Sequence, residues 1–222
     1  MQQIELIEAG LSDYRELWRL QEKLFSEVQN NRDKNYLILT EHNPVITRGK
    51  SAKSASLLSS ESHLHSIGID LIAIDRGGDF TFHGPGQLVG YPILNLLNFK
   101  KDIHWYLRAL EEVIIKTIAD YGLDGTRIEG LTGVWVDGKK ICAIGVKITR
   151  WVTMHGFALN VNTDLKYFHH IIPCGISERG VTSISELTGN IISLKDVSNH
   201  LTLNFEKIFS AVTTTVITDQ KQ

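Results

Sequence analysis

The chain has 222 residues, of which 42% are hydrophobic and 22% charged, and its net charge is −2. This composition is ordinary for a globular protein with its own core, and the charge argues against a nucleic-acid binder that depends on bulk positive potential. No apolar run approaches the roughly 20 residues that span a bilayer, and no secretory signal opens the chain. Two cysteines are too few for a disulfide framework, so a reducing, cytoplasmic location is expected.

The first predicted elements alternate between helices and strands. Ser12 is a candidate N-cap for a helix through about Val28, because apolar residues follow it at helical spacing. Residues 36–40, 69–75 and 88–94 are expected to be strands, and residues 50–66 a polar loop with a short helix. Residues 102–121 form the clearest predicted helix, with Asp102 as its cap and Gly122 at its C-terminal stop.

The second half begins with the strongest local signal in the chain. Residues 132–136 and 140–148 flank Asp137-Gly138, which is typical of a tight β-hairpin turn. Residues 152–161 indicate a further strand, interrupted at His155-Gly156, and residues 193–212 a C-terminal helix opened by Ser193. Because the hairpin requires antiparallel pairing, the expected fold is α+β with a mixed sheet. We expect one domain over residues 1–222, with the C-terminal helix as a candidate small lobe.

Residues 76–87, which read Arg-Gly-Gly-Asp-Phe-Thr-Phe-His-Gly-Pro-Gly-Gln, are too rich in glycine for an ordinary strand. Glycines let the backbone approach a ligand closely, Pro85 stiffens the turn, and Arg76 and His83 supply donors. A tight turn with a core histidine is the alternative explanation. The segment lacks the Gly-Lys-Ser/Thr ending of a phosphate loop and the spacing of a dinucleotide fingerprint. It therefore predicts a binding site of another kind.

Cys174 lies between Pro173 and Gly175, a turn context that favours function over packing. A cysteine is nucleophilic as its thiolate, and a nearby ammonium group favours that form. Lys140, which follows the hairpin turn, is the candidate cation, and a solvated lysine at a strand end is the alternative. Strand alternation puts residues 140 and 142 on one face, so Lys140 can also neighbour Cys142, whose apolar surroundings are typical of core packing.

Three further observations restrict the chemistry. Gly156 inside a predicted strand indicates the close approach of another group. The histidines at 63 and 65 and at 169 and 170 lack a ligand spacing, so no metal site is expected. No serine stands in a Gly-x-Ser-x-Gly elbow, which argues against a serine hydrolase.

Together these motifs resemble those of the lipoyl(octanoyl) transferase family, over about residues 36–186. The matching signatures are Arg76-Gly77-Gly78 with residues 81–87, then residues 140–145, then residues 155–162, then Pro173-Cys174-Gly175. The resemblance implies a fold like that of biotin and lipoate protein ligases, with a mixed, largely antiparallel sheet flanked by helices. It implies that Cys174 is the acyl-thioester nucleophile and that Lys140 lowers the pKa of this cysteine and acts in acid–base catalysis. It also implies a substrate channel lined by Arg76, Gly77, Gly78, Asp79, Phe80, Thr81, Phe82, His83, Ala143, Ile144, Gly145, Gly156, Phe157 and Ala158.

The reaction that the resemblance implies is octanoyl transfer. The donor is octanoyl-acyl carrier protein, which holds the chain on its phosphopantetheine, and the acceptor is a specific lysine on lipoyl domains of 2-oxoacid dehydrogenases or on the glycine cleavage H protein. No cofactor, metal, nucleic acid or membrane partner is expected. Two alternatives stay open: an ATP-dependent lipoate or biotin ligase, which needs no cysteine, and a non-catalytic module that binds lipoyl domains.

Overall fold

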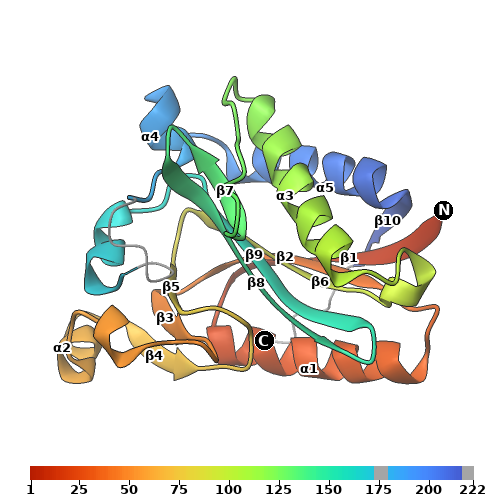
Figure 1. Ribbon diagram of the computed structural model, residues 1–222, viewed down its shortest axis with the longest axis horizontal. Coiled ribbons are helices and arrows are strands. Elements are labelled where there is room, and N and C mark those ends of the chain that lie inside the picture. Colours follow the sequence, from red (N-terminus) through yellow and green to blue (C-terminus); the bar gives the residue numbers. More distant parts are fainter. Residues whose placement is uncertain (173–179, 217–222) are drawn as a thin grey trace.

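The computed structural model describes residues 1–172 and 180–216, and Figure 1 shows how its elements are layered. A seven-stranded sheet crosses the centre. Helices α3 (Ile103–Ala119) and α5 (Leu194–Phe209) cover one face, and α1 (Tyr14–Asn30) covers the other. A three-stranded sheet and the short helix α2 (Glu61–Ser66) lie at one end of this layer.

The large sheet has the strand order β10-β1-β2-β6-β9-β8-β7. Strand β1 is parallel to both β10 and β2, and every other neighbouring pair is antiparallel. This arrangement confirms the expected mixed, largely antiparallel sheet flanked by helices. The strands are β1 (Gln2–Ser12), β2 (Tyr36–His42), β6 (Gln87–Ile93), β7 (Gly133–Val136), β8 (Lys139–Thr149), β9 (Val152–Asn160) and β10 (Ala211–Thr215).

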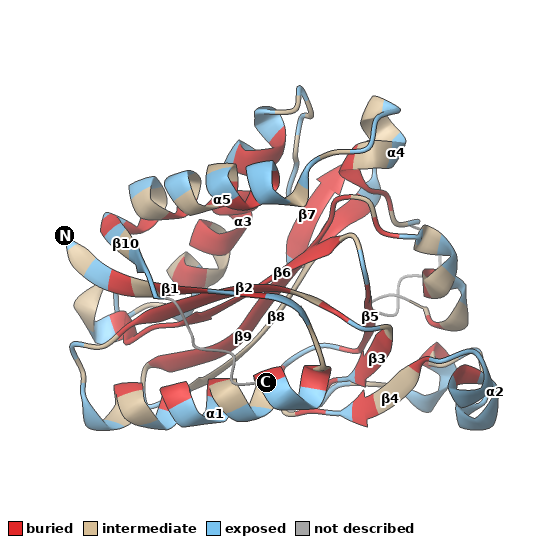
Figure 2. Ribbon diagram, turned by 180° about the vertical axis from the view of Figure 1, so that it is seen from behind, coloured by how far each residue is buried: buried red, intermediate tan, exposed pale blue. Residues whose placement is uncertain are grey.

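Successive side chains along the central strands pack alternately on the two faces of the sheet. On β2, Leu37 and Leu39 pack toward α3 and α5, whereas Tyr36 and Ile38 pack toward α1. Both faces are therefore apolar, and the central strands are buried along most of their length (Figure 2). A shift of one residue in register would exchange the two sets of side chains, so this double burial specifies the pairing.

The small sheet has the order β4-β3-β5 and consists of β3 (Val45–Arg48), β4 (Asp70–Ala73) and β5 (Phe80–His83). The glycine-rich segment therefore contains an ordinary strand, which the sequence analysis did not predict. The strand occupies the glycine-free stretch 80–83, and the glycines flank it on both sides. The polar segment 50–66 forms the short helices η1 (Ser54–Ser56) and α2, as expected.

Local signals placed several elements correctly. Asp137 and Gly138 both have positive φ, 48° and 76°, as a two-residue hairpin turn requires. Asp102 caps α3 by accepting a hydrogen bond from the Trp105 N–H at 3.0 Å. Gly122 has a φ of 75° beyond the end of that helix.

Other boundaries were predicted wrongly. Asp13 caps α1, because its carboxylate accepts from the second and third turn-forming N–H groups, while Ser12 ends β1. Strand β9 is not interrupted at His155-Gly156 but continues through both residues, although His155 has a φ of 59°. The C-terminal helix ends at Phe209 and packs on α3 and the sheet rather than forming a lobe, and β10 follows it. Strand β1 was not predicted.

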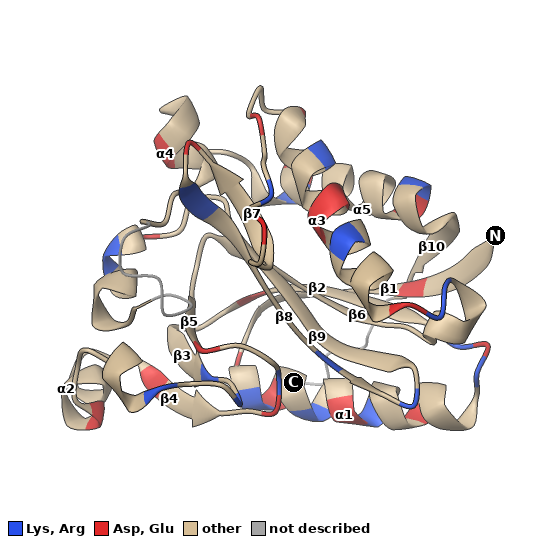
Figure 3. Cartoon of the chain, in the orientation of Figure 1, with Lys and Arg blue, Asp and Glu red and all other residues tan. Residues whose placement is uncertain are grey.

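Charged residues lie mainly on helices and loops, and the middle of the large sheet carries few of them (Figure 3). Four charged residues of the described part of the chain are nevertheless buried: Arg76 and Lys140, each 7% exposed, Asp79, 9% exposed, and Glu111, which is fully buried. Charged groups are rarely buried unless polar partners surround them, so each of these residues indicates a polar site inside the fold. No helix in the described part of the chain is long and apolar enough to cross a membrane.

Candidate active site

A pocket lies on the part of the sheet face that α1 leaves uncovered, and its empty space, open solvent at the mouth included, is about 480 Å³. The adjacent strands β8 and β9 supply a floor of small side chains, Ala143 and Gly145 from one and Gly156 and Ala158 from the other. Small residues leave room above the sheet for an apolar ligand. The lining consists of Tyr14, Arg76, Gly78, Asp79, Phe80, Thr81, His83, Val89, Tyr91, Ala143, Ile144, Gly145, His155, Gly156, Phe157 and Ala158.

The loop 76–79 lies over this floor and is held by backbone hydrogen bonds. The Gly77 N–H donates to the Val146 carbonyl of β8 at 3.0 Å. The backbone N–H groups of residues 49–51 donate to carbonyl oxygens of the same loop. Gly78 has a φ of 90°, which favours glycine. A β-carbon at Gly145 would lie 3.0 Å from the Gly77 oxygen, so a side chain there would push the loop away from the sheet. Glycines at 78 and 145 therefore let the loop approach the strand.

The Arg76 side chain braces the same loop. Its Nη2 donates to the carbonyl and hydroxyl oxygens of Thr47 on β3, at 3.0 and 2.9 Å, and its Nη1 donates to the Gly77 carbonyl at 2.9 Å. Arg76 also lines the pocket. The guanidinium group thus joins the loop to the small sheet, and its predicted contact with substrate stays a prediction.

The predicted substrate-binding residues gather at this pocket with two exceptions. Phe82 points the other way and stacks on Tyr167, with ring centroids 4.7 Å apart. Gly77 lines a neighbouring groove instead. Thr81 and His83 share the face opposite to Phe82, whereas Phe80, the first residue of β5, lines the pocket although alternation puts it on the Phe82 face.

Four lining residues were missing from the predicted set: Tyr14, Val89, Tyr91 and His155. Tyr14 is the first residue of α1, and Val89 and Tyr91 point from β6 to the face that carries the pocket. Alternation does place residues 89 and 91 on one face. Their proximity to Ala158 depends on β6 lying beside β9, which spacing in the sequence does not reveal.

A buried hydrogen-bond chain runs from the pocket toward Lys140. The Gln87 amide nitrogen donates to the Asn160 Oδ1 at 2.9 Å, and the Asn160 amide nitrogen donates to the Thr182 carbonyl at 3.0 Å. The Gln87 Oε1 then faces the His83 Nδ1 at 2.9 Å, so this nitrogen carries the proton and the Nε2 of the neutral ring has a lone pair. Burial holds the pKa of His83 well below its usual range. Thr182 in turn donates its N–H to the Lys140 carbonyl at 3.0 Å.

A second polar group closes the other side of the pocket. The His155 Nε2 lies 2.8 Å from the Asp75 Oδ1, and Lys147 pairs with the second oxygen of this carboxylate. The hydrogen bond from His155 holds the pKa of Asp75 well below its usual range, assisted by Lys147, whereas burial lowers the pKa of His155 despite Asp75. The positive φ of His155 is uncommon for a residue with a side chain and marks local strain. The charges of Asp75 and Lys147 compensate each other beside the pocket.

Lys140 lies at the start of β8, between the β7 strand and the segment 180–182. Its N–H donates to the Gly180 carbonyl at 2.9 Å, and its Nζ lies 4.9 Å from the centre of the Trp135 ring. The ring face provides a favourable environment for a cation. The lysine is 7% exposed and is therefore not the solvated strand-end residue of the alternative explanation.

The two cysteines have different outcomes. Cys142 is fully buried in the core beneath α3, which confirms its interpretation as a packing residue, and burial raises the pKa of its thiol strongly. Val134 pairs with Cys142 and Trp135 pairs with Lys140, so β8 has one extra residue, a bulge, between Lys140 and Cys142. The bulge breaks the expected alternation, which had put these two residues on the same face. Cys174 lies outside the described residues, and its pairing with Lys140 stays a prediction.

Two further hollows adjoin the pocket, and Lys140 lines both. A small one shares Thr81, Ala143 and Ala158 with the pocket. A larger groove, with about 1010 Å³ of empty space including open solvent, shares four residues with the pocket: Gly78, Asp79, Ile144 and Gly145. It continues along Ser51, Lys53, Leu107, Leu131 and Thr132. Lys140 therefore lies where an apolar pocket meets a wide groove.

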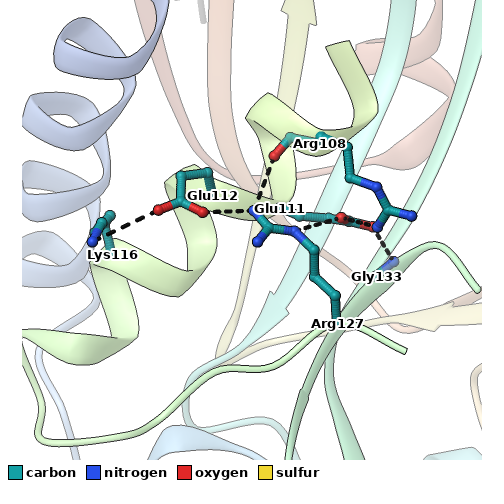
Figure 4. A network of polar contacts seen from close by, with 6 residues as sticks. All are labelled: Arg108, Glu111, Glu112, Lys116, Arg127 and Gly133. Atoms are coloured by element: carbon teal, nitrogen blue, oxygen red, sulfur yellow. Dashed lines mark hydrogen bonds and ion pairs between the residues drawn. The ribbon is translucent and has the colours of Figure 1, made fainter. Parts of the chain in front are cut away.

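A buried carboxylate on α3 fixes the start of β7 (Figure 4). Glu111 of α3 accepts from Arg108 at 2.6 Å, from the Arg127 Nε at 3.0 Å and from the Gly133 N–H at 3.1 Å. Gly133 opens β7, and a β-carbon there would lie 3.5 Å from the Lys140 Cε. The network thus attaches the strand that packs against Lys140 to the helix behind the sheet.

The histidine pairs lie away from this site. The rings of His63 and His170 are 5.8 Å apart, and the His170 Nδ1 hydrogen-bonds the Ser59 hydroxyl at 2.8 Å. Within residues 1–172 and 180–216, no three His, Cys, Asp or Glu side chains gather in a way that could hold a metal ion.

Comparison with known proteins places this geometry in a family. Residues 13–206 match the lipoyl protein ligase A/B catalytic domain. The chain is 48% identical to an octanoyltransferase of Christiangramia forsetii, with 94% of this chain and 97% of that one covered. It is 50% identical to an octanoyltransferase of Rubrobacter xylanophilus, with 90% of each chain covered.

Solved structures show the same fold at low identity. A crystal structure of lipoate-protein ligase A bound with ATP superposes with a TM-score of 0.79 at 19% identity and covers 97% of this chain and 89% of that chain. A biotin protein ligase from Aquifex aeolicus, in complex with biotin and ATP, gives a TM-score of 0.55 at 14% identity and covers 95% and 71%. The chain belongs to the lipoyl protein ligase A/B catalytic domain family and, within it, to the octanoyltransferases.

Proposed function

We propose that this enzyme moves an octanoyl group from octanoyl-acyl carrier protein, through a thioester on Cys174, to a lysine of lipoyl domains or of the glycine cleavage H protein. The observation that carries the proposal is the position of Lys140 between the apolar pocket and the wide groove. The pocket suits an acyl chain, and the groove suits the two protein substrates, which would present a thioester and an amine in turn. The near-50% identity to octanoyltransferases supports the same assignment.

The first step would be attack by the Cys174 thiolate on the carbonyl carbon of the donor thioester. A new carbon–sulfur bond forms, the bond to the phosphopantetheine sulfur breaks, and the departing thiolate takes up a proton from the Lys140 ammonium, which leaves Lys140 neutral for the second step. Lys140, as a cation, would favour the thiolate form of Cys174. Its position against the Trp135 ring, with the Nζ 4.9 Å from the ring centre, holds the cation at the site.

The second step would be attack by the acceptor lysine on the Cys174 thioester. An amide forms, Cys174 leaves as a thiolate, and the surplus proton of the amine passes to a base, for which we propose Lys140. Amide formation from a thioester is downhill, so no cofactor and no ATP are required. The covered pocket keeps water from the intermediate between the two steps.

Intact-mass spectrometry after mixing with octanoyl-acyl carrier protein tests this proposal. The wild-type enzyme should gain one octanoyl group, Cys174→Ala should gain none, and Lys140→Met should gain it much more slowly. Cys142→Ala is the matched control, because that thiol is buried and its pKa is raised, and it should be acylated like the wild type. Full transfer by Cys174→Ala would contradict the proposal.

An ATP-dependent ligase is the second candidate, because an ATP-bound lipoate-protein ligase shares the fold. Product formation from free octanoate, ATP and a lipoyl domain would favour it. Transfer from the carrier protein without nucleotide favours the acyltransferase. A thiol at residue 174 that reacts slowly with iodoacetamide near neutral pH, with no product in either assay, would indicate a non-catalytic binding module.

A further inference from the structure

One end of the pocket adjoins the two hollows that contain Lys140, and the opposite end lies away from them. The lining residues shared with the two hollows that contain Lys140 are Gly78, Asp79, Thr81, Ala143, Ile144, Gly145 and Ala158. Tyr14, Tyr91 and His155 line the pocket but neither hollow, whereas His83 also hydrogen-bonds Gln87, which lines the small hollow. The sheet register agrees for the strands of the floor, since His155 pairs with Val146, which is six residues from Lys140 on β8, or roughly 20 Å along a strand.

The end away from Lys140 is closed by aromatic rings that carry polar atoms. Tyr14 stacks on His83 with centroids 5.8 Å apart and an interplanar angle of 16°. The Tyr91 hydroxyl lies 2.7 Å from the His42 Nε2. Tyr14 and Tyr91 are each 3% exposed, and burial raises the pKa of both phenols. These groups are therefore neutral near pH 7.

Several contacts hold this end wall in place. Tyr14 begins α1 directly after the cap residue Asp13, so the helix start fixes its backbone. Its ring lies 5.0 Å from the His42 ring and packs with Val45 and Ile72 of the small sheet and with Ile74, the residue after β4. Because the small sheet is behind it, the ring cannot swing away without opening a second core.

We propose that Tyr14, supported by Tyr91, sets the maximum length of the acyl chain that the enzyme accepts. This inference rests on the proposed function and names the specificity determinant of the same pocket. Each methylene that enters the pocket raises affinity about fourfold. Once the chain reaches the wall, a further methylene must displace a packed ring or bury the phenol oxygens against hydrocarbon, which is unfavourable.

A series of acyl-carrier-protein thioesters with 6, 8, 10 and 12 carbons tests the inference. For Tyr14→Ala, the ratio of kcat/KM for the 10-carbon over the 8-carbon donor should rise at least tenfold above that of the wild type. Leu17→Ala is the matched control, because Leu17 is buried on the same helix but does not line the pocket. It should lose stability and leave the ratio unchanged.

Binding of the free fatty acids is measured in parallel by calorimetry, because it reports the pocket length without any transfer. Absence of octanoyl transfer by the wild type would refute the proposed function. If the wild type transfers octanoyl groups but Tyr14→Ala has the same chain-length preference as the wild type in both assays, the role of Tyr14 in setting chain length is refuted. If Tyr14→Ala does not fold, Tyr14→Leu and Tyr91→Phe should shift the same ratio in the same direction by a smaller factor. An unchanged ratio in folded forms of these variants also overturns the inference.

Discussion

Replacing the buried carboxylate of Glu111 tests the claim that its network fixes the strand beside Lys140. Glu111→Gln keeps the shape of the side chain and one acceptor oxygen but removes the charge that Arg108 and Arg127 pair with. Hydrogen bonds to a charged group contribute about 1.5–3 kcal/mol each, against about 0.5–1.5 kcal/mol for neutral ones. The two arginine side chains are 39% and 34% exposed, so water replaces part of what they lose.

The Gly133 N–H is the partner that water cannot easily reach, because Gly133 is buried. We therefore expect Glu111→Gln to lower the free energy of unfolding by about 1–2 kcal/mol, which corresponds to about 2–8 °C in Tm for a domain of this size. Urea unfolding at pH 7 measures the first quantity and calorimetry the second. The rate of Cys174 acylation should fall as well, since Gly133 packs against the Lys140 side chain.

Glu112→Gln is the matched control. Glu112 is the next residue on the same helix and pairs with the same Arg127, at 2.6 Å, but its side chain is 34% exposed. Exposed ion pairs contribute little, so we expect a loss of about 0.5 kcal/mol or less. Equal losses for the two variants, or an unchanged stability of Glu111→Gln, would refute the reasoning from burial.

Three further predictions concern the site. Burial lowers the pKa of His42 to about 4 in the folded protein. Because the unfolded chain protonates this histidine below about pH 6.5, the free energy of unfolding should fall between pH 6.5 and 4, by roughly 3 kcal/mol at most. A urea midpoint that stays constant over this range would contradict the prediction. Gly145→Ala should push back the Gly77 carbonyl and reduce kcat/KM for octanoyl transfer roughly tenfold, with unfolding measured alongside to show that the variant is folded. Asn160→Asp removes the donor to the Thr182 carbonyl and should slow acylation while leaving affinity for octanoate within about twofold; unchanged acylation kinetics would show that this bond does not position Lys140.

Features that depend on neighbouring residues could be predicted from the sequence, and features that depend on strand pairing could not. The hairpin at Asp137-Gly138 and the cap at Asp102 were predicted because a few neighbouring residues determine the backbone there. The burial of Cys142 was predicted from its apolar surroundings. The bulge that separates it from Lys140 was not, because a bulge depends on how β8 pairs with β7.

The sequence by itself determined the hairpin turn at Asp137-Gly138 and the cap at Asp102, and through its family motifs it indicated most of the residues that line the pocket. Only the tertiary structure decided that β6 lies beside β9, that the start of α1 closes the pocket with Tyr14, and that Lys140 stands between the pocket and the groove. The physical reason is range. Backbone preferences act over a few residues and can be read from spacing, whereas strand order and the covering of a sheet face follow from the burial of apolar surface by segments far apart in the chain.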